Sequence, residues 1–260
     1  MSEVLSHGTF NWVDLLAKEM QRARAFYEPL FGWTYEEQPS HGGPPYGLFK
    51  KDGKQAAGIG QMPPPMAEQN IPPMWNTYVL VDDIAAAEAT AKANGGQLMF
   101  DTINIPNTGK TNWVTDPEGA VFVLWQNLGR PGAEIFNVPG SFSWNERATA
   151  DLDTVKSFYS AMFGWTFKDE RENDSVMSMI HNREGREMGH ALVMDDAMKK
   201  KVPPHWAVYF TVADRAQSIE HAKSLGGQLV MGPIEIQPGW FALLSDNDGA
   251  MFYIFETKKQ

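Results

Sequence analysis

The sequence predicts an α+β fold built from two copies of one domain, and two observations support this prediction. The first is a long-range repeat, in which the stretch 26–33 (FYEPLFGW) returns 132 residues later as 158–165 (FYSAMFGW). Three further pairs keep nearly the same offset: Trp12 with Trp144, 94–98 with 225–229, and 116–120 with 246–250. The second is a regular alternation of amphipathic helices with short runs of β-branched and aromatic residues.

Each half resolves into two modules in which a strand is followed by a helix and three shorter strands, so the chain holds four β-α-β-β-β modules. The helices are predicted at 19–31, 84–94, 151–163 and 214–224. The opening strands are predicted at 9–16, 75–81, 141–147 and 206–212. The remaining strands are predicted at 33–36, 46–50, 56–60, 97–100, 111–115, 120–125, 165–168, 176–181, 188–193, 228–231, 240–245 and 250–256.

Proline and glycine positions mark the boundaries of these elements. Pro29 is expected to end regular helical hydrogen bonding one turn early. The proline-rich segment 62–73 is predicted to be a stiff connector, and the segment 194–201 a charged one. The predicted domains are therefore residues 1–128 and 141–260, with a linker at 129–140.

Composition narrows the classes of function. The chain has no cysteine, which excludes disulfides, thiolate catalysis and cysteine-bound zinc. A net charge of −10 argues against nucleic acid or an anionic membrane as partner. No apolar run approaches a membrane span, and residues 1–7 do not have the pattern of a secretory signal. These features predict a cytoplasmic protein that acts on a small molecule.

The repeated motifs FYxxxFGW and DPEGA resemble those of the vicinal oxygen chelate superfamily, which includes glyoxalases, bleomycin-resistance proteins and extradiol dioxygenases. The resemblance covers nearly the whole chain and is strongest to two-domain glyoxalase-like proteins often labelled hydroxylases. It implies that paired modules form mixed sheets curled into cups. It also implies that each cup can hold a divalent metal through histidine and glutamate side chains.

The resemblance also places the superfamily's metal ligands on this chain. In the first half the positions fall on Trp12, Asn76 and Val123, and in the second on Trp144, Ala207 and Tyr253. A further position falls near residues 59–60 and near His190 or Ala191. Because indole, valine and alanine side chains donate no lone pair to a metal, we predict neither a metal nor another cofactor.

Strand alternation identifies the residues that share a face with these positions. Asp14 and Glu146 lie two residues after the repeated tryptophans and are the candidate general acid or base groups. The candidate ligand-binding residues are Trp12, Asn76, Tyr78, Val123, Trp144, His205, Tyr209 and Tyr253. Two alternatives remain open: the tryptophans could be core residues, and the two carboxylates could be exposed strand-end residues.

Two classes of function are compatible with these residues. The first is a binding protein that sequesters a small planar or aromatic molecule in an aromatic-lined cup. The alternative is a metal-independent glyoxalase- or hydroxylase-like enzyme that uses the inward carboxylates and tyrosines. We expect a monomer, although a homodimer is an alternative, because one chain supplies all four modules. We also expect the cups to differ, with the one holding Asp14, Asn76 and Tyr78 open and the one walled by Tyr253 partly closed.

Overall fold

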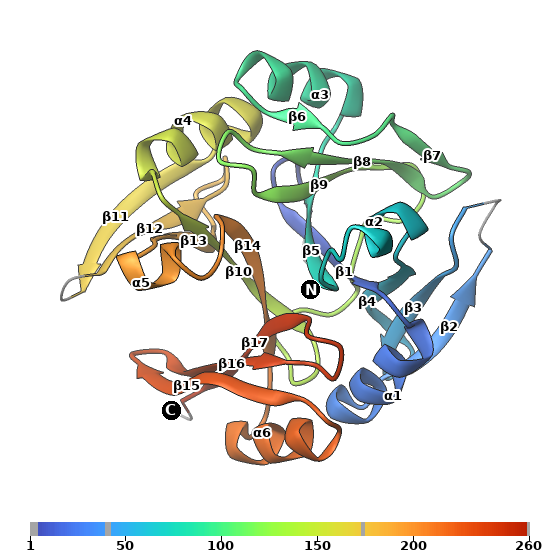
Figure 1. The fold of residues 1–260 in the computed structure, drawn as a ribbon. Helices are drawn as coiled ribbons and strands as arrows, with labels where there is room; N and C mark the ends of the chain where they lie inside the picture. Colours follow the sequence, from blue (N-terminus) through green and yellow to red (C-terminus); the bar gives the residue numbers. More distant parts are fainter. Residues whose placement is uncertain (1–4, 40–42, 173–174, 259–260) are drawn as a thin grey trace. The chain divides into compact units, whose positions relative to one another are not determined.

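The computed structural model describes residues 5–39, 43–172 and 175–258 and contains two mixed β-sheets (Figure 1). The first half comprises β1 (Phe10–Ala17), α1 (Met20–Phe31), β2 (Thr34–Gln38), β3 (Tyr46–Lys51), β4 (Lys54–Gln61), α2 (Pro64–Glu68), β5 (Met74–Leu80), α3 (Ile84–Ala93), β6 (Gln97–Leu98), β7 (Ile103–Ile105), β8 (Gly109–Thr115) and β9 (Val121–Asn127). The second half comprises β10 (Phe142–Thr149), α4 (Leu152–Phe163), β11 (Thr166–Glu172), β12 (Ser175–His181), β13 (Glu187–Val193), α5 (Asp196–Lys199), β14 (His205–Thr211), α6 (Arg215–Ser224), β15 (Gln228–Ile236), β16 (Gly239–Ser245) and β17 (Met251–Thr257).

The two sheets repeat one topology. The first has the strand order β2-β3-β4-β1-β5-β9-β8-β6, with β7 paired to β8, and the second has the order β11-β12-β13-β10-β14-β17-β16-β15. Within each module the opening strand pairs in parallel with the last strand, as β1 does with β4 and β5 with β9, while the other pairs are antiparallel. The predicted α+β class with a tandem repeat is therefore confirmed, whereas the curling of the sheets into cups stays a prediction.

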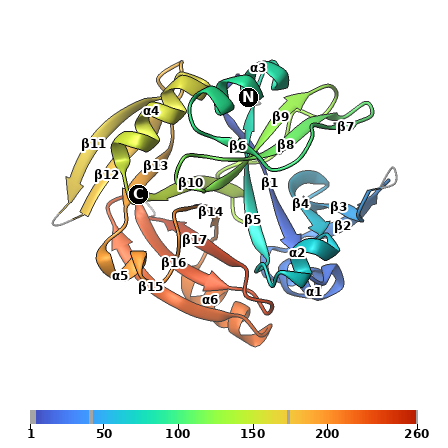
Figure 2. The same cartoon turned by 45° about the horizontal axis from the view of Figure 1, so that its top comes forward.

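Local structure departs from the sequence predictions at a few places. Helix α1 continues through Pro29 to Phe31. The proline removes only one backbone donor, and Gly32, at φ 66°, still donates to Glu28 O and closes the last turn. The two connectors contain the short helices α2 and α5, the second capped by the Asp195 carboxylate. The strand predicted at 97–100 is shorter, since β6 ends at Leu98. The additional strand β7 pairs with the first residues of β8, 109–111 (Figure 2).

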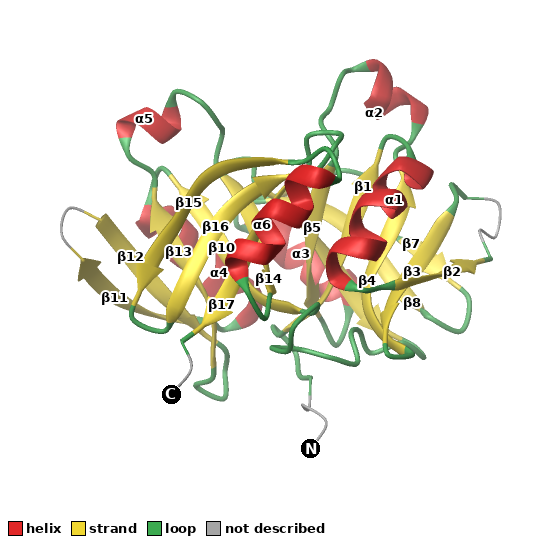
Figure 3. Ribbon diagram, turned by 90° about the horizontal axis from the view of Figure 1, so that it is seen from below, coloured by secondary structure: helices red, strands yellow, loops and turns green. Residues whose placement is uncertain are grey.

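The chain divides into two compact units, each of which combines one module from each half. One unit contains residues 1–11, 77–132 and 144–207, and the other contains 12–76, 133–143 and 208–260. In the first unit α3 packs on α4, and in the second α1 packs on α6 (Figure 3). The packing partners of a module are therefore not its neighbours in sequence. The predicted domain boundaries describe the sequence repeat and stay a prediction.

The repeated FY motif, at 26–27 and 158–159, meets the turns at 246–250 and 116–120 inside these units. In the second unit the buried Tyr27 hydroxyl donates to Asp246 Oδ2 at 3.1 Å and accepts from Trp75 Nε1 at 3.0 Å. Burial, and then the charge of Asp246, raises the pKa of Tyr27 well above its ordinary value, so the phenol stays a donor. A tyrosine from one half is thus bonded to an aspartate from the other half.

None of the helices within the described ranges is long and apolar enough to cross a bilayer. The predicted absence of a secretory signal rests on residues 1–7, of which 1–4 lie outside the described residues. The cytoplasmic location and the absence of nucleic-acid and membrane partners stay predictions from sequence.

Candidate functional site

In the unit that contains 12–76, a buried carboxylate is held by two hydrogen-bond donors from other strands. Asp14 Oδ1 accepts from Asn76 Nδ2 at 2.9 Å, and Asp14 Oδ2 accepts from the Tyr46 hydroxyl at 3.3 Å. The Tyr46 oxygen in turn accepts from Trp12 Nε1 at 3.1 Å. Trp12, Asp14 and Asn76 are between 4 and 6% exposed. The structure therefore brings together three residues predicted from sequence and adds Tyr46.

Tyr46 reaches Asp14 because the facing residue on β4 is a glycine. Asp14 pairs with Gly58 in the parallel β1–β4 ladder. A Cβ atom at Gly58 would lie 2.8 Å from Tyr46 Cζ and 2.9 Å from Asp14 Cβ. Any larger side chain would therefore displace the phenol ring.

The other unit contains the corresponding cluster with a different central group. Trp144 Nε1 donates to His190 Nδ1 at 2.8 Å, and His190 Nε2 lies 3.1 Å from Glu146 Oε2. An indole N–H can only donate, so Nδ1 is the acceptor and the ring proton sits on Nε2, where it bonds the carboxylate. Glu146 is 3% exposed. The imidazole therefore bridges two residues that the sequence predicted separately.

The repeat offset relates the two clusters residue by residue. Glu146 pairs with His190 in the β10–β13 ladder, as Asp14 pairs with Gly58. Each half thus connects a tryptophan to a buried carboxylate, through a phenol in one half and an imidazole in the other. The alternative that these carboxylates are exposed strand-end residues is wrong, because Asp14 and Glu146 lie within β1 and β10 and both are buried.

A second set of predicted residues lies on rows that cross neighbouring strands. In the first row, Tyr78 of β5 pairs with Val123 of β9, which pairs with Trp113 of β8. The ring of Trp113 packs edge-to-face against Tyr78 at 6.4 Å and against Phe100 at 6.1 Å. The row runs from the buried Tyr78 through the half-buried Trp113 to Phe100, which is 47% exposed.

The corresponding second row places its rings differently. Tyr209 of β14 pairs with Tyr253 of β17, which pairs with Leu243 of β16, and Leu243 pairs with Met231 of β15. The Tyr209 and Tyr253 rings stack in parallel, 4.2 Å apart with 8° between their planes. Both tyrosines are buried. The second row therefore has aliphatic side chains, Leu243 and Met231, at its two outer positions, and it has an additional ring, Tyr253, at its inner position.

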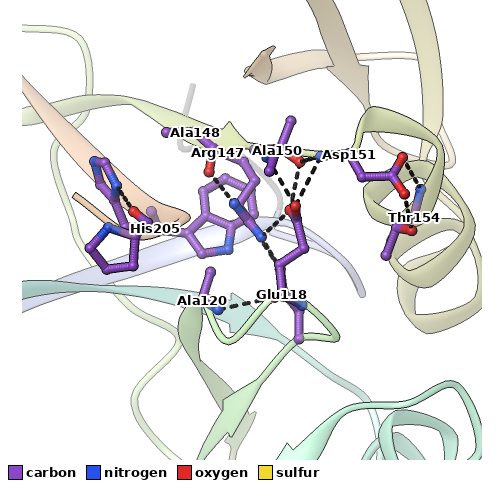
Figure 4. A network of polar contacts seen from close by, with 12 residues as sticks. Glu118, Ala120, Arg147, Ala148, Ala150, Asp151, Thr154 and His205 are labelled. Atoms are coloured by element: carbon purple, nitrogen blue, oxygen red, sulfur yellow. Dashed lines mark hydrogen bonds and ion pairs between the residues drawn. The ribbon is translucent and has the colours of Figure 1, made fainter. Parts of the chain in front are cut away.

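His205 lies away from these rows, at the start of β14. Its Nδ1 is 2.8 Å from the carbonyl oxygen of Pro203 (Figure 4). The ring is half-buried, as expected for the edge of a strand rather than its centre. Its predicted role in ligand binding stays a prediction.

The residues at the superfamily's metal positions do not fit a metal. Trp12 Nε1 is a donor that is already bonded to Tyr46, and Val123 offers no lone pair. His190 and Glu146 supply two groups where a closed site needs three or four. Among residues 5–39, 43–172 and 175–258, no three His, Asp or Glu side chains converge as a metal site requires.

Sequence reasoning missed a buried ionic network in the unit that contains 144–207. Arg147 is fully buried, and its Nη2 lies 2.7 Å from Asp116 Oδ2. The same nitrogen lies 2.8 Å from Glu118 Oε2 (Figure 4). Burial, and then the charge of Asp116, raises the pKa of Tyr159, whose hydroxyl donates to Asp116 at 2.9 Å. The signal in the sequence was an arginine within a strand where the repeat has Leu15.

Comparison with known proteins agrees with this architecture. Residues 9–124 match the family model described as Glyoxalase/Bleomycin resistance protein/Dioxygenase superfamily, and residues 146–255 match one described as Glyoxalase-like domain. CFP32 of Mycobacterium tuberculosis, provisionally named a glyoxylase, is 36% identical over 97% of this chain and 96% of that protein.

Two further relatives are more distant. The anthracycline biosynthesis protein DauV of Streptomyces sp. strain C5 is 28% identical over 95% of this chain and 93% of its own length. The crystal structure of the Mn(II)-bound glyoxalase from Novosphingobium aromaticivorans superposes with a TM-score of 0.65 at 16% identity, covering 97% of this chain and 83% of that one. That likeness concerns the fold alone.

Proposed function

This chain is a two-domain member of the glyoxalase/bleomycin resistance protein/dioxygenase superfamily, and from that premise we propose that it binds a small organic molecule with a planar aromatic part. The ligand contacts that we propose are Trp113 and Phe100, which lie on the same row as Tyr78 and Val123, two of the residues predicted from sequence. Superfamily membership by itself does not select a ligand, because function depends on the side chains of the site.

The observation that carries the proposal is the gradient of exposure along the first row. Tyr78 is buried, Trp113 is half-buried and Phe100 is 47% exposed, so aromatic surface continues from the core to solvent. The ring of Trp113 meets its two neighbours edge-to-face, at interplanar angles of 71° and 86°, so neither pair is a parallel stack. A planar molecule can stack on the face of such a ring, which is worth about 0.5–1.5 kcal/mol per ring pair beyond buried area.

The backbone at Phe100 is fixed by a hydrogen bond from a buried side chain. The backbone oxygen of Phe100 accepts from Asn112 Nδ2 at 3.0 Å, and the same nitrogen donates to Glu88 Oε1 at 2.8 Å. Asn112 is fully buried. Because the segment is already fixed, a ligand would lose less free energy in ordering it.

The names of relatives are compatible with a planar ligand. DauV is named for anthracycline biosynthesis, and an anthracycline contains a fused planar ring system. The net charge of −10 favours a neutral or cationic molecule over an anionic one.

Fluorescence titration tests the proposal. The probes are 1,4-dihydroxyanthraquinone, which is planar and neutral, and 9-aminoacridine, which is planar and cationic; perhydroanthracene, which is saturated, is the control. We expect saturable quenching of tryptophan fluorescence by at least one planar probe and none by the saturated compound. Quenching that does not saturate with either planar probe, or equal affinity for the saturated compound, would contradict the proposal.

A metal-independent enzyme is the second candidate, favoured by the His190–Glu146 pair. Its 3.1 Å contact orients a buried carboxylate that could take a proton from a carbon next to a carbonyl. The test is deuterium uptake from D₂O into hydroxyacetone, followed by NMR, in the wild type and in Glu146→Gln. We expect uptake above the buffer rate that is lost in the variant, with Glu68→Gln, an exposed carboxylate, as control. Uptake at the buffer rate in the wild type would exclude this reaction for that substrate.

A further inference from the structure

We propose that the chain binds one aromatic ligand, on the outer part of the first row at Trp113 and Phe100, and that the second row binds none, because Tyr253 is stacked on Tyr209 and the outer residues Leu243 and Met231 are aliphatic. This inference rests on the proposed binding of a planar aromatic molecule and specifies which half carries it. The two rows occupy equivalent positions in the repeat, and each row lies within one unit.

The rows correspond position by position. Tyr78 and Tyr209 occupy the same place on the opening strands of the second modules, 131 residues apart. The other pairs are Val123 with Tyr253, Trp113 with Leu243, and Phe100 with Met231. The position next to the tyrosine common to both rows is therefore aliphatic in the first row (Val123) and aromatic in the second (Tyr253). The two outer positions are aromatic in the first row and aliphatic in the second.

This exchange decides whether ring faces are available. In the second row the parallel stack at 4.2 Å uses one face of each tyrosine, and Phe241 packs at 5.9 Å against Tyr253. Tyr209 and Tyr253 are 6 and 5% exposed. A ring buried in a stack cannot also receive a ligand, because a close-packed interior leaves no room for one.

The outer part of the second row offers aliphatic side chains instead. Leu243 is half-buried and Met231 is 39% exposed, so solvent reaches this surface as it reaches Trp113 and Phe100. Neither side chain has a ring face on which a planar molecule could stack. The two rows thus have similar exposure but different chemistry.

The support beneath the outer position also differs. In the first half the buried Asn112 bonds the Phe100 backbone and Glu88. The repeat has Ala242 and Ile219 at these two places, and neither side chain can form such bonds. At these equivalent positions the first half has an exposed ring whose backbone is bonded by a polar side chain, and the second half has neither the ring nor the polar side chain.

The experiment exchanges residues at the equivalent positions of the two rows. The first variant, Trp113→Leu with Phe100→Met, gives the first row the residues of the second, and the control, Leu243→Ala with Met231→Ala, trims the second row. Binding of 1,4-dihydroxyanthraquinone and 9-aminoacridine is measured by calorimetry and by equilibrium dialysis. We expect one site per wild-type chain, a loss of affinity of at least tenfold in the first variant, and less than a twofold change in the control.

A third variant transplants the first row into the second half through Tyr253→Val, Leu243→Trp and Met231→Phe. We expect two sites per chain in this protein if it retains the wild-type circular dichroism spectrum. Two equal sites in the wild type, or unchanged affinity in Trp113→Leu with Phe100→Met, would overturn the inference while leaving the proposed binding function intact. Absence of any saturable binding by the wild type would overturn both.

Discussion

Replacing Arg147 with leucine tests the buried ionic network most directly. Leucine is the natural residue at the equivalent position, Leu15, so the strand itself tolerates it. The substitution leaves the carboxylates of Asp116 and Glu118 without their shared cation, although Tyr159 still donates to Asp116. Removing one partner of a buried ion pair costs about 3–5 kcal/mol, because the remaining charge stays desolvated.

This loss of free energy of unfolding should lower the urea midpoint measurably. With a denaturant slope of about 2–3 kcal/mol per M, the urea midpoint should fall by roughly 1–2.5 M. Tryptophan fluorescence and circular dichroism provide two probes of the same transition. The control is Lys156→Met, which removes the ion pair with the partly exposed Asp169 in the same unit and should cost at most about 1 kcal/mol.

The urea midpoint gives the result that would refute the reasoning. A midpoint of Arg147→Leu within 0.3 M of the wild type, used here as roughly the resolution of the method, would show that Arg147 does not neutralise these carboxylates.

Three further predictions concern single features. Burial raises the pKa of Asp246 above its ordinary 3.8, partly offset by hydrogen bonds, so the wild type loses stability as pH rises through the raised value. In urea titrations Asp246→Asn should therefore gain stability relative to the wild type as pH rises from about 4 to about 7, and a relative loss over this range would contradict the prediction. Gly58→Ala should cost about 1–3 kcal/mol by displacing Tyr46, and the cost should fall in a Tyr46→Leu background; an equal cost in both would exclude this contact. Light scattering at low micromolar concentration should give the 29.1 kDa mass of one chain, and a mass twice as large would exclude a monomer.

Much of the fold could be predicted because it depends on local patterns. Helix ends at Gly32 and Gly164 follow from glycine's ability to adopt positive φ, here 66° and 68°. The repeat identified four modules because both halves retain the same motifs. The inward direction of Asp14 and Glu146 was predicted by strand alternation once the resemblance placed Trp12 and Trp144 inward, since a strand's side chains alternate between faces.

Tertiary structure decided which groups meet. The sequence placed Tyr46 and His190 on strands but could not show that each bridges a tryptophan and a carboxylate, because that depends on the register of β1 with β4 and of β10 with β13. The pairing of modules into units was equally open. The sequence shows two halves in series, yet Tyr27 finds its partner Asp246 219 residues away.

The sequence by itself thus determined the α+β class, the four modules, and the loss of metal-binding side chains at the superfamily's positions. These features follow from residue type and spacing, which the chain carries in any conformation. Only the folded chain decided that Tyr253 stacks on Tyr209 while Trp113 and Phe100 meet edge-to-face. The physical reason is that ring geometry and burial depend on residues brought together across strands, and a single chain's order of residues does not specify those distances.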